Sequence, residues 1–146
     1  MKIFVFLLAW FMSVVAMSSF STLMGHIFDS EFREEIILSK LISGNSFNQK
    51  DHSVYSILGW FIHFLVGGLF LYVYAIIWEW NLANLPLWET IVFGSVIGFL
   101  GIIGWSITFK IYHDPPKINF KGYYIQLFFA HIVFSLVAMI VFQWLR

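Results

Sequence analysis

Long apolar runs alternate with short polar segments along this chain, and the alternation predicts its architecture. A helix needs about 20 apolar residues to cross a hydrocarbon layer of about 30 Å. Four runs meet this requirement, at roughly 3–25, 54–78, 87–111 and 122–145. The pattern therefore predicts an all-α integral membrane four-helix bundle, with residues 1–146 forming a single transmembrane domain.

The first apolar run permits two interpretations. Lys2 precedes an apolar stretch that reaches small residues at Ala16, as in secretory signal peptides, which would place a cleavage after residues 1–16. The run continues beyond Ala16 through Phe20 and Leu23, which is more typical of a helix that stays in the protein. We therefore expect a retained transmembrane helix here.

A short amphipathic helix is predicted between the first two runs, at roughly residues 31–43. Ser30 is a favoured N-cap residue, glutamates follow in the first turn, and Gly44 is a favoured residue at a helix end. The apolar residues of this segment share one face: Phe32, Ile36, Ile37 and Leu41. We expect the helix to lie at the membrane interface, the alternative being a solvated helix packed on a neighbouring loop.

Basic residues are distributed unevenly between the two ends of the predicted bundle. The first and third loops contain Arg33, Lys40, Lys50, Lys110, Lys117 and Lys121. The opposite side has only Lys2 and Arg146. Because cytoplasmic loops are enriched in Lys and Arg, loops one and three are predicted to face the cytoplasm, although Lys2 favours the reverse orientation for the first helix.

Composition narrows the classes of partner and chemistry. The chain is 60% hydrophobic and 11% charged, and eight Lys and Arg balance eight Asp and Glu. No basic stripe is available for nucleic acid, so the lipid bilayer is the expected partner and nucleic acid is not. The chain has no cysteine, which excludes disulfides, thiolate metal sites and thiol nucleophiles.

Two histidines lie inside apolar runs and are the main candidate functional residues. His63 and His131 each fall about nine residues into a predicted helix, about 14 Å deep at 1.5 Å per residue. Both helices start from the same side, so the two rings are expected near the midplane. Each histidine has a small residue four positions later on its own helical face, Gly67 and Ser135 respectively.

Three interpretations of this pair remain open. In the first, each ring hydrogen-bonds a hydroxyl or carbonyl of a neighbouring helix and stabilises the bundle by about 0.6–2 kcal/mol. In the second, His63 and His131 are the axial ligands of a haem b, with Gly67 and Ser135 lining its site. In the third, the histidines belong to a proton or ion path.

Small residues at helical spacing predict close helix packing. The third run contains Gly94, Gly98, Gly101 and Gly104, and the second contains Ser56, Gly59, His63 and Gly67. Such faces let helix backbones approach closely in lipid. Surplus faces of this kind also fit a homo-oligomer or a place in a larger membrane complex.

Signatures of soluble enzymes are missing from the sequence. We find no phosphate-binding glycine loop, dinucleotide fingerprint, zinc-protease motif or serine elbow, so an enzyme is not favoured. The adjacent pair His113 and Asp114 could bind a cation, although such a pair before two prolines is more typical of a solvated turn.

Three segments together resemble an uncharacterised family of small prokaryotic four-helix membrane proteins. They are Gly59 to Gly67, the tract Gly94 to Trp105 followed by His113-Asp114-Pro115-Pro116, and Gln126 to Ser135. The resemblance covers roughly residues 13–142 and implies an inner-membrane fold with a histidine in helices two and four. It implies no activity.

These observations favour a non-enzymatic binding or assembly module in the prokaryotic inner membrane. In this interpretation His63 and His131 face each other or a shared neighbour. The alternative functions are a haem b electron carrier or subunit and a proton or ion transporter.

Overall fold

The computed structural model describes residues 2–43, 54–78, 84–112, 115 and 117–145. Its helices are α1 (Lys2–Ile27), α2 (Glu34–Ser43), α3 (Val54–Ile77), α4 (Leu87–Ile111) and α5 (Phe120–Trp144). The described residues contain no β-strand. Four of the helices, α1, α3, α4 and α5, are long and apolar enough to cross a membrane. The predicted all-α class and four long apolar helices are therefore confirmed.

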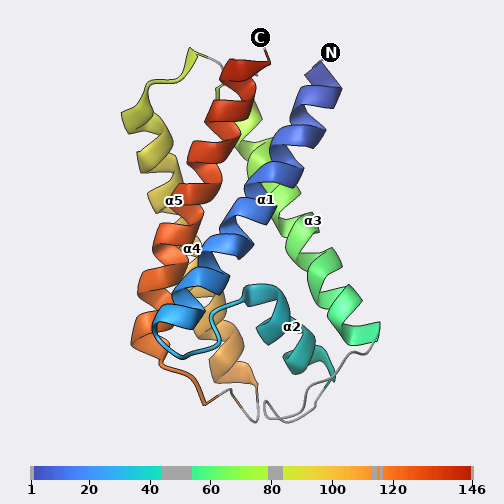
Figure 1. Cartoon of the computed structure of the whole chain (residues 1–146), viewed down its shortest axis with the longest axis vertical. Coiled ribbons are helices and arrows are strands. Elements are labelled where there is room, and N and C mark those ends of the chain that lie inside the picture. Colours follow the sequence, from blue (N-terminus) through green and yellow to red (C-terminus); the bar gives the residue numbers. More distant parts are fainter. Residues whose placement is uncertain (1, 44–53, 79–83, 113–114, 116, 146) are drawn as a thin grey trace.

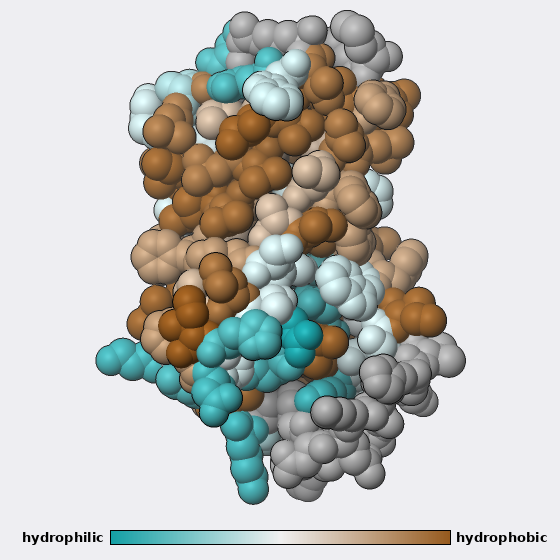
Figure 2. Space-filling model, viewed as in Figure 1, coloured by the Kyte–Doolittle hydropathy of each residue, from teal (hydrophilic) through white to brown (hydrophobic). Residues whose placement is uncertain are grey.

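The four long helices run alternately up and down, with α2 at one end (Figure 1). Both termini lie at the opposite end, so α3 and α5 run parallel to each other away from α2. Figure 2 shows a mostly apolar surface along the long helices and polar residues at both ends, over a larger area at the end that contains α2. An apolar middle between two polar ends is typical of helices that cross a membrane.

Helix α5 packs closely on both α1 and α4 and forms the centre of the fold. On α4, a Cβ added at Gly94 would lie 2.8 Å from the Ile132 Cα, so only glycine permits this approach. Towards α1, the Gln126 amide donates a 2.5 Å hydrogen bond to the Ser21 hydroxyl. Half of the most apolar window of α5 is buried, the largest share among the four long helices.

Helix α3 is held more loosely, and only 17% of its most apolar window is buried. It packs on α2 at Gly59, where a Cβ would collide with the backbone oxygen of Glu35. It packs on α1 at Gly67, where a Cβ would lie 2.6 Å from the Val14 side chain. The glycines of the second run are thus close-packing positions, as the sequence predicts.

Helices α3 and α4 meet near the loop that joins them. The Tyr74 ring stacks on Phe93 with centroids 4.1 Å apart, and the Tyr74 hydroxyl donates a 3.0 Å hydrogen bond to Thr90. Beside them, the Trp78 indole donates a 2.7 Å bond to the Glu89 carboxylate. Towards the other end the two helices separate, and α2 lies between them in Figure 1.

The start of the short helix differs from the prediction. Helix α2 begins at Glu34 rather than residue 31, and the Ser30 amide donates to the Gly25 carbonyl in a turn instead of Ser30 capping the helix. Glu34 and Glu35, in the first turn of α2, are buried, at 8% and 2% exposed. They are buried because this part of α2 packs against the long helices. The predicted end at Gly44 lies outside the described residues.

Candidate functional site

His63 and His131 line one cavity of about 300 Å³. Its walls come from α3, α4 and α5, and α2 forms the end nearest the polar part of the molecule. His63 lies nine residues after Val54, the start of α3, and His131 lies eleven residues after Phe120, the start of α5. At 1.5 Å per residue the two depths differ by about 3 Å.

The cavity opens sideways, where α3 and α4 separate. Its rim includes Val66 of α3 and Leu100 of α4, which are 40% and 52% exposed. Between them, a Cβ added at Gly104 would meet no atom within 4 Å. The opening therefore faces the apolar outer surface of the long helices rather than the polar end of the molecule.

One ring nitrogen of His131, on α5, has no hydrogen-bond partner among the described residues. Its Nδ1 lies 2.8 Å from the Leu127 carbonyl oxygen and must donate to it, because a carbonyl only accepts. In the neutral ring, Nε2 is then a hydrogen-bond acceptor. The ring fits against Gly101 of α4, where a Cβ would lie 3.0 Å from Cε1 and 3.4 Å from Nε2. Phe70 of α3 meets the same ring edge-on, with centroids 6.1 Å apart.

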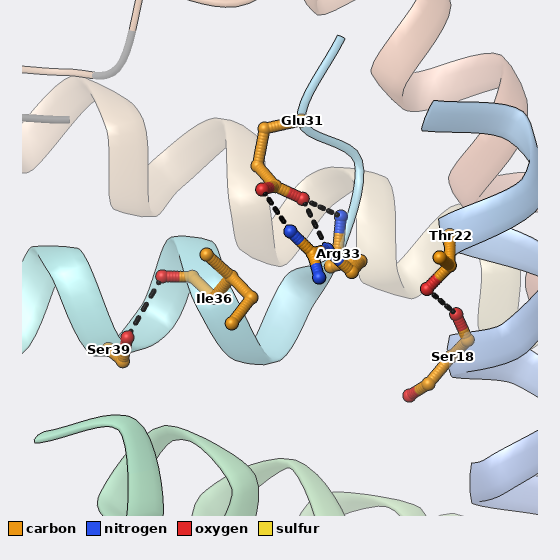
Figure 3. Close-up of polar contacts among 6 residues, drawn as sticks. All are labelled: Ser18, Thr22, Glu31, Arg33, Ile36 and Ser39. Carbon is orange, nitrogen blue, oxygen red and sulfur yellow. Dashed lines mark hydrogen bonds and ion pairs between the residues drawn. The ribbon is translucent and has the colours of Figure 1, made fainter. Parts of the chain in front are cut away.

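His63 belongs to a polar junction of three helices. Its Nε2 lies 3.3 Å from the Ser18 hydroxyl of α1, and the same hydroxyl lies 3.5 Å from the Glu35 carboxylate of α2. Figure 3 shows the Ser18 hydroxyl pointing away from Thr22, whose own hydroxyl donates to the Ser18 carbonyl. Glu35, Ser18 and His63 thus form a continuous line of polar contacts between α2 and the cavity.

Glu34 is the acidic residue of the cavity wall. One carboxyl oxygen accepts a 3.4 Å hydrogen bond from the Trp105 indole of α4, and the other has no partner among the described residues. Burial raises the pKa of Glu34 to about 8, the Trp105 bond opposes the rise, and nearby Glu35 adds to it. At neutral pH this carboxyl therefore keeps its proton and can donate it in a hydrogen bond.

The acidic residues around Glu34 respond differently to their surroundings. Burial also raises the pKa of Glu35, which the Arg33 charge partly opposes. Burial acts on Glu31 as well, but bonds from the backbone and side chain of Arg33 outweigh it and lower its pKa. The Arg33 guanidinium lies 2.7 Å from the Glu31 carboxylate (Figure 3). Arg33 is therefore committed to Glu31 and leaves Glu34 without a cation.

The remaining sequence candidates lie elsewhere or nearby. Gly67 lines a narrow inner extension of about 20 Å³, shared with both histidines and Glu34. Such a volume is large enough for one water molecule. The Ser135 hydroxyl donates to the His131 backbone carbonyl on its own helix. His113 and Asp114 lie outside the described residues, within which no group of three metal-ligating side chains converges.

Sequence reasoning missed the cavity residues of α2 and α4. From the sequence, Glu34 was one of the glutamates in the first turn of the short helix, and Trp105 was only the end of the tract that begins at Gly94. The local pattern contained no signal for their burial, because adjacent residues of a helix lie about 100° apart and Glu34 and Glu35 both fit on one polar face. The Glu34 bond to Trp105 depends on the tertiary fold, which local pattern does not contain.

The arrangement supports binding and proton exchange. An apolar, laterally open cavity provides room for an apolar body, and Glu34 and His131 provide one hydrogen-bond donor and one acceptor. Comparison of the chain with known protein families, curated proteins and solved structures gave no significant match.

Proposed function

We propose that this protein is a four-span protein of the prokaryotic cytoplasmic membrane, with loops one and three on the cytoplasmic side. The distribution of Lys and Arg between the loops supports the orientation. The four long apolar helices support the membrane location. In this orientation the end containing α2 is cytoplasmic.

Within the membrane, we infer that the protein is a non-enzymatic binding module for an apolar molecule that enters from the bilayer. The observation that carries this proposal is the cavity of about 300 Å³ that contains His63, His131 and Glu34 and opens between α3 and α4. In a four-span protein that opening faces lipid tails. A ligand dissolved in the bilayer reaches it without crossing water, and its polar group meets the buried polar residues.

The test is whether the protein retains a specific small molecule through this opening. Wild-type protein is extracted with its native lipid into polymer nanodiscs, and its small molecules are identified by mass spectrometry. Gly104→Phe adds a ring at the mouth, where a Cβ meets no atom within 4 Å. Ile103→Phe is the matched control, because Ile103 is 55% exposed on the same helix and does not line the cavity.

We expect a molecule that is enriched over bulk lipid in wild type and Ile103→Phe and is absent from Gly104→Phe. Equal amounts of every molecule in all three preparations would contradict the proposal. Circular dichroism and size-exclusion profiles check that each variant is folded.

A haem b carrier is a second candidate, and one feature of His131 favours it. Its Nδ1 donates to the Leu127 carbonyl and leaves Nε2 available, the arrangement that metal-ligating histidines adopt. His63 would have to release Ser18 to act as the opposite ligand through Nε2. Purification from haem-supplied cells tests this: a Soret band that disappears in His63→Ala and His131→Ala supports haem, and a colourless folded protein rejects it.

A further inference from the structure

The cavity lining restricts the charge of its ligand. Glu34 is its only residue of the Asp, Glu, Lys and Arg set, and no lysine or arginine is among the described residues that line it. Arg33 is paired with Glu31. An anionic head such as a phosphate would lie beside a buried carboxyl without a compensating cation, which is strongly unfavourable. The cavity therefore suits a neutral head.

The two polar groups of the wall come from different helices, and each of them contacts an aromatic residue of the wall. Glu34 approaches from α2, bonded to the Trp105 indole of α4. His131 approaches from α5 with Phe70 edge-on against it. A flat ring with a polar atom on each of two sides can contact Trp105 and Phe70 and meet both polar groups.

The line of contacts from Glu35 through Ser18 to His63 restricts the ligand further. It joins the cavity to α2, with separations of 3.5 Å and 3.3 Å. Groups of this kind can pass protons between a buried site and an interface. A line of groups that can pass protons fits a ligand whose polar atoms gain and lose protons.

From these features we propose that the cavity binds the ring of a membrane-dissolved quinone or quinol, with His131 and Glu34 as its two polar partners. This proposal rests on the proposed function, because it names the class of molecule that enters the same site. A quinone carbonyl accepts a hydrogen bond from the Glu34 carboxyl. A quinol hydroxyl donates to the free Nε2 of His131.

Decylubiquinone is the probe, added to the full-length protein in nanodiscs of neutral lipid. The readout is quenching of tryptophan fluorescence, with Trp105→Phe used to isolate the contribution of the tryptophan in the cavity wall. We expect saturable quenching by decylubiquinone that Ile103→Phe retains and Gly104→Phe loses. His131→Phe, which keeps a ring but removes the acceptor nitrogen, is expected to weaken the binding of decylubiquinol, whose hydroxyl donates to Nε2, at least tenfold. Thr108→Phe, at another exposed position of the lining, is a second blocking variant should Gly104→Phe fail to fold.

The competing ligand is dioctanoylglycerol, a neutral lipid with a single flexible hydroxyl. Quenching that rises only in proportion to decylubiquinone in the membrane, with the same slope in every folded variant, would overturn the quinone proposal. If a molecule other than a quinone is retained in the mass-spectrometric test and dioctanoylglycerol binds in place of decylubiquinone, the quinone proposal fails and the proposed function stands. If neither test finds a specific ligand, both fail.

Discussion

Two parts of the molecule are built differently. The first is α5 with α1 and α4, where a Cβ added at Gly94 would lie only 2.8 Å from the Ile132 Cα and half of the apolar window of α5 is buried. The second is α3 with α2, and only 17% of the apolar window of α3 is buried. Helix α3 contacts α4 mainly through aromatic side chains at one end. The histidine cavity lies at the boundary between them. The closely packed part holds the fold together, and the more loosely packed part borders the cavity.

The largest difference in stability between the two parts is expected when glycines of α4 are replaced by leucine. Gly94→Leu places a side chain against the Ile132 backbone, which cannot move without separating α4 from α5. We expect a loss of about 3 kcal/mol or more in the free energy of unfolding, measured by SDS titration in mixed micelles. Gly104→Leu on the same helix meets open space and should change stability by less than about 0.5 kcal/mol. Equal losses in both variants would contradict the division into two parts.

The buried carboxyl of Glu34 should make stability depend on pH. Below pH 4.5, its ordinary pKa, the carboxyl is protonated in both folded and unfolded protein. As the pH rises from there to about 8, the unfolded chain ionises while the folded site keeps its proton, so stability falls. Glu34→Gln should remove a few kcal/mol of this decline and raise the thermal midpoint at pH 8.

Two neighbouring carboxyls also affect how stability depends on pH, and one of them provides a control. Glu35 also has a raised pKa, so Glu34→Gln should weaken the decline rather than abolish it. Glu31 has a lowered pKa and contributes stability above its unfolded pKa, so Glu31→Gln should lower the midpoint at pH 8. A midpoint that responds to pH in the same way in wild type and Glu34→Gln would refute the assignment.

The contact between α3 and α4 should contribute moderately to the free energy of unfolding. Tyr74→Phe keeps the stack on Phe93 and removes the hydroxyl that donates to Thr90. We expect a loss of about 0.6–2 kcal/mol in the free energy of unfolding, the range for hydrogen bonds between helices in membranes. Ser95→Ala is a control of similar size change on α4, because the Ser95 hydroxyl bonds only the Ile91 carbonyl of its own helix. A larger loss in the control would show that the interhelical bond is not the cause.

The smallest effect is expected at the junction of α1, α2 and α3. Ser18→Ala removes the hydroxyl between Glu35 and His63, whose contacts of 3.5 Å and 3.3 Å are long. The loss of stability should therefore stay below about 1 kcal/mol. A loss above 3 kcal/mol would mean that this junction, rather than the packing of α5, holds the fold together.

The local sequence pattern predicted the long helices well, because each helix forms its backbone hydrogen bonds within itself and needs only an apolar surface. The placement of His63 and His131 in parallel helices followed from chain direction alone. The burial of Glu34 could not be predicted from the sequence, because its partner Trp105 is 71 residues away and comes from a different helix. The start of α2 was placed early because the turn after Gly25 and the pairing of Arg33 with Glu31 compete with a cap at Ser30.

The stack of Tyr74 on Phe93 has a mechanical consequence for α3. His63 lies 11 residues along the helix from Tyr74, a lever of about 16 Å at 1.5 Å per residue. A tilt of α3 by about 10° around the stack therefore displaces His63 by about 3 Å. The aromatic pair next to the α3–α4 loop therefore helps to fix the distance from α4 of His63, which lies near the middle of α3.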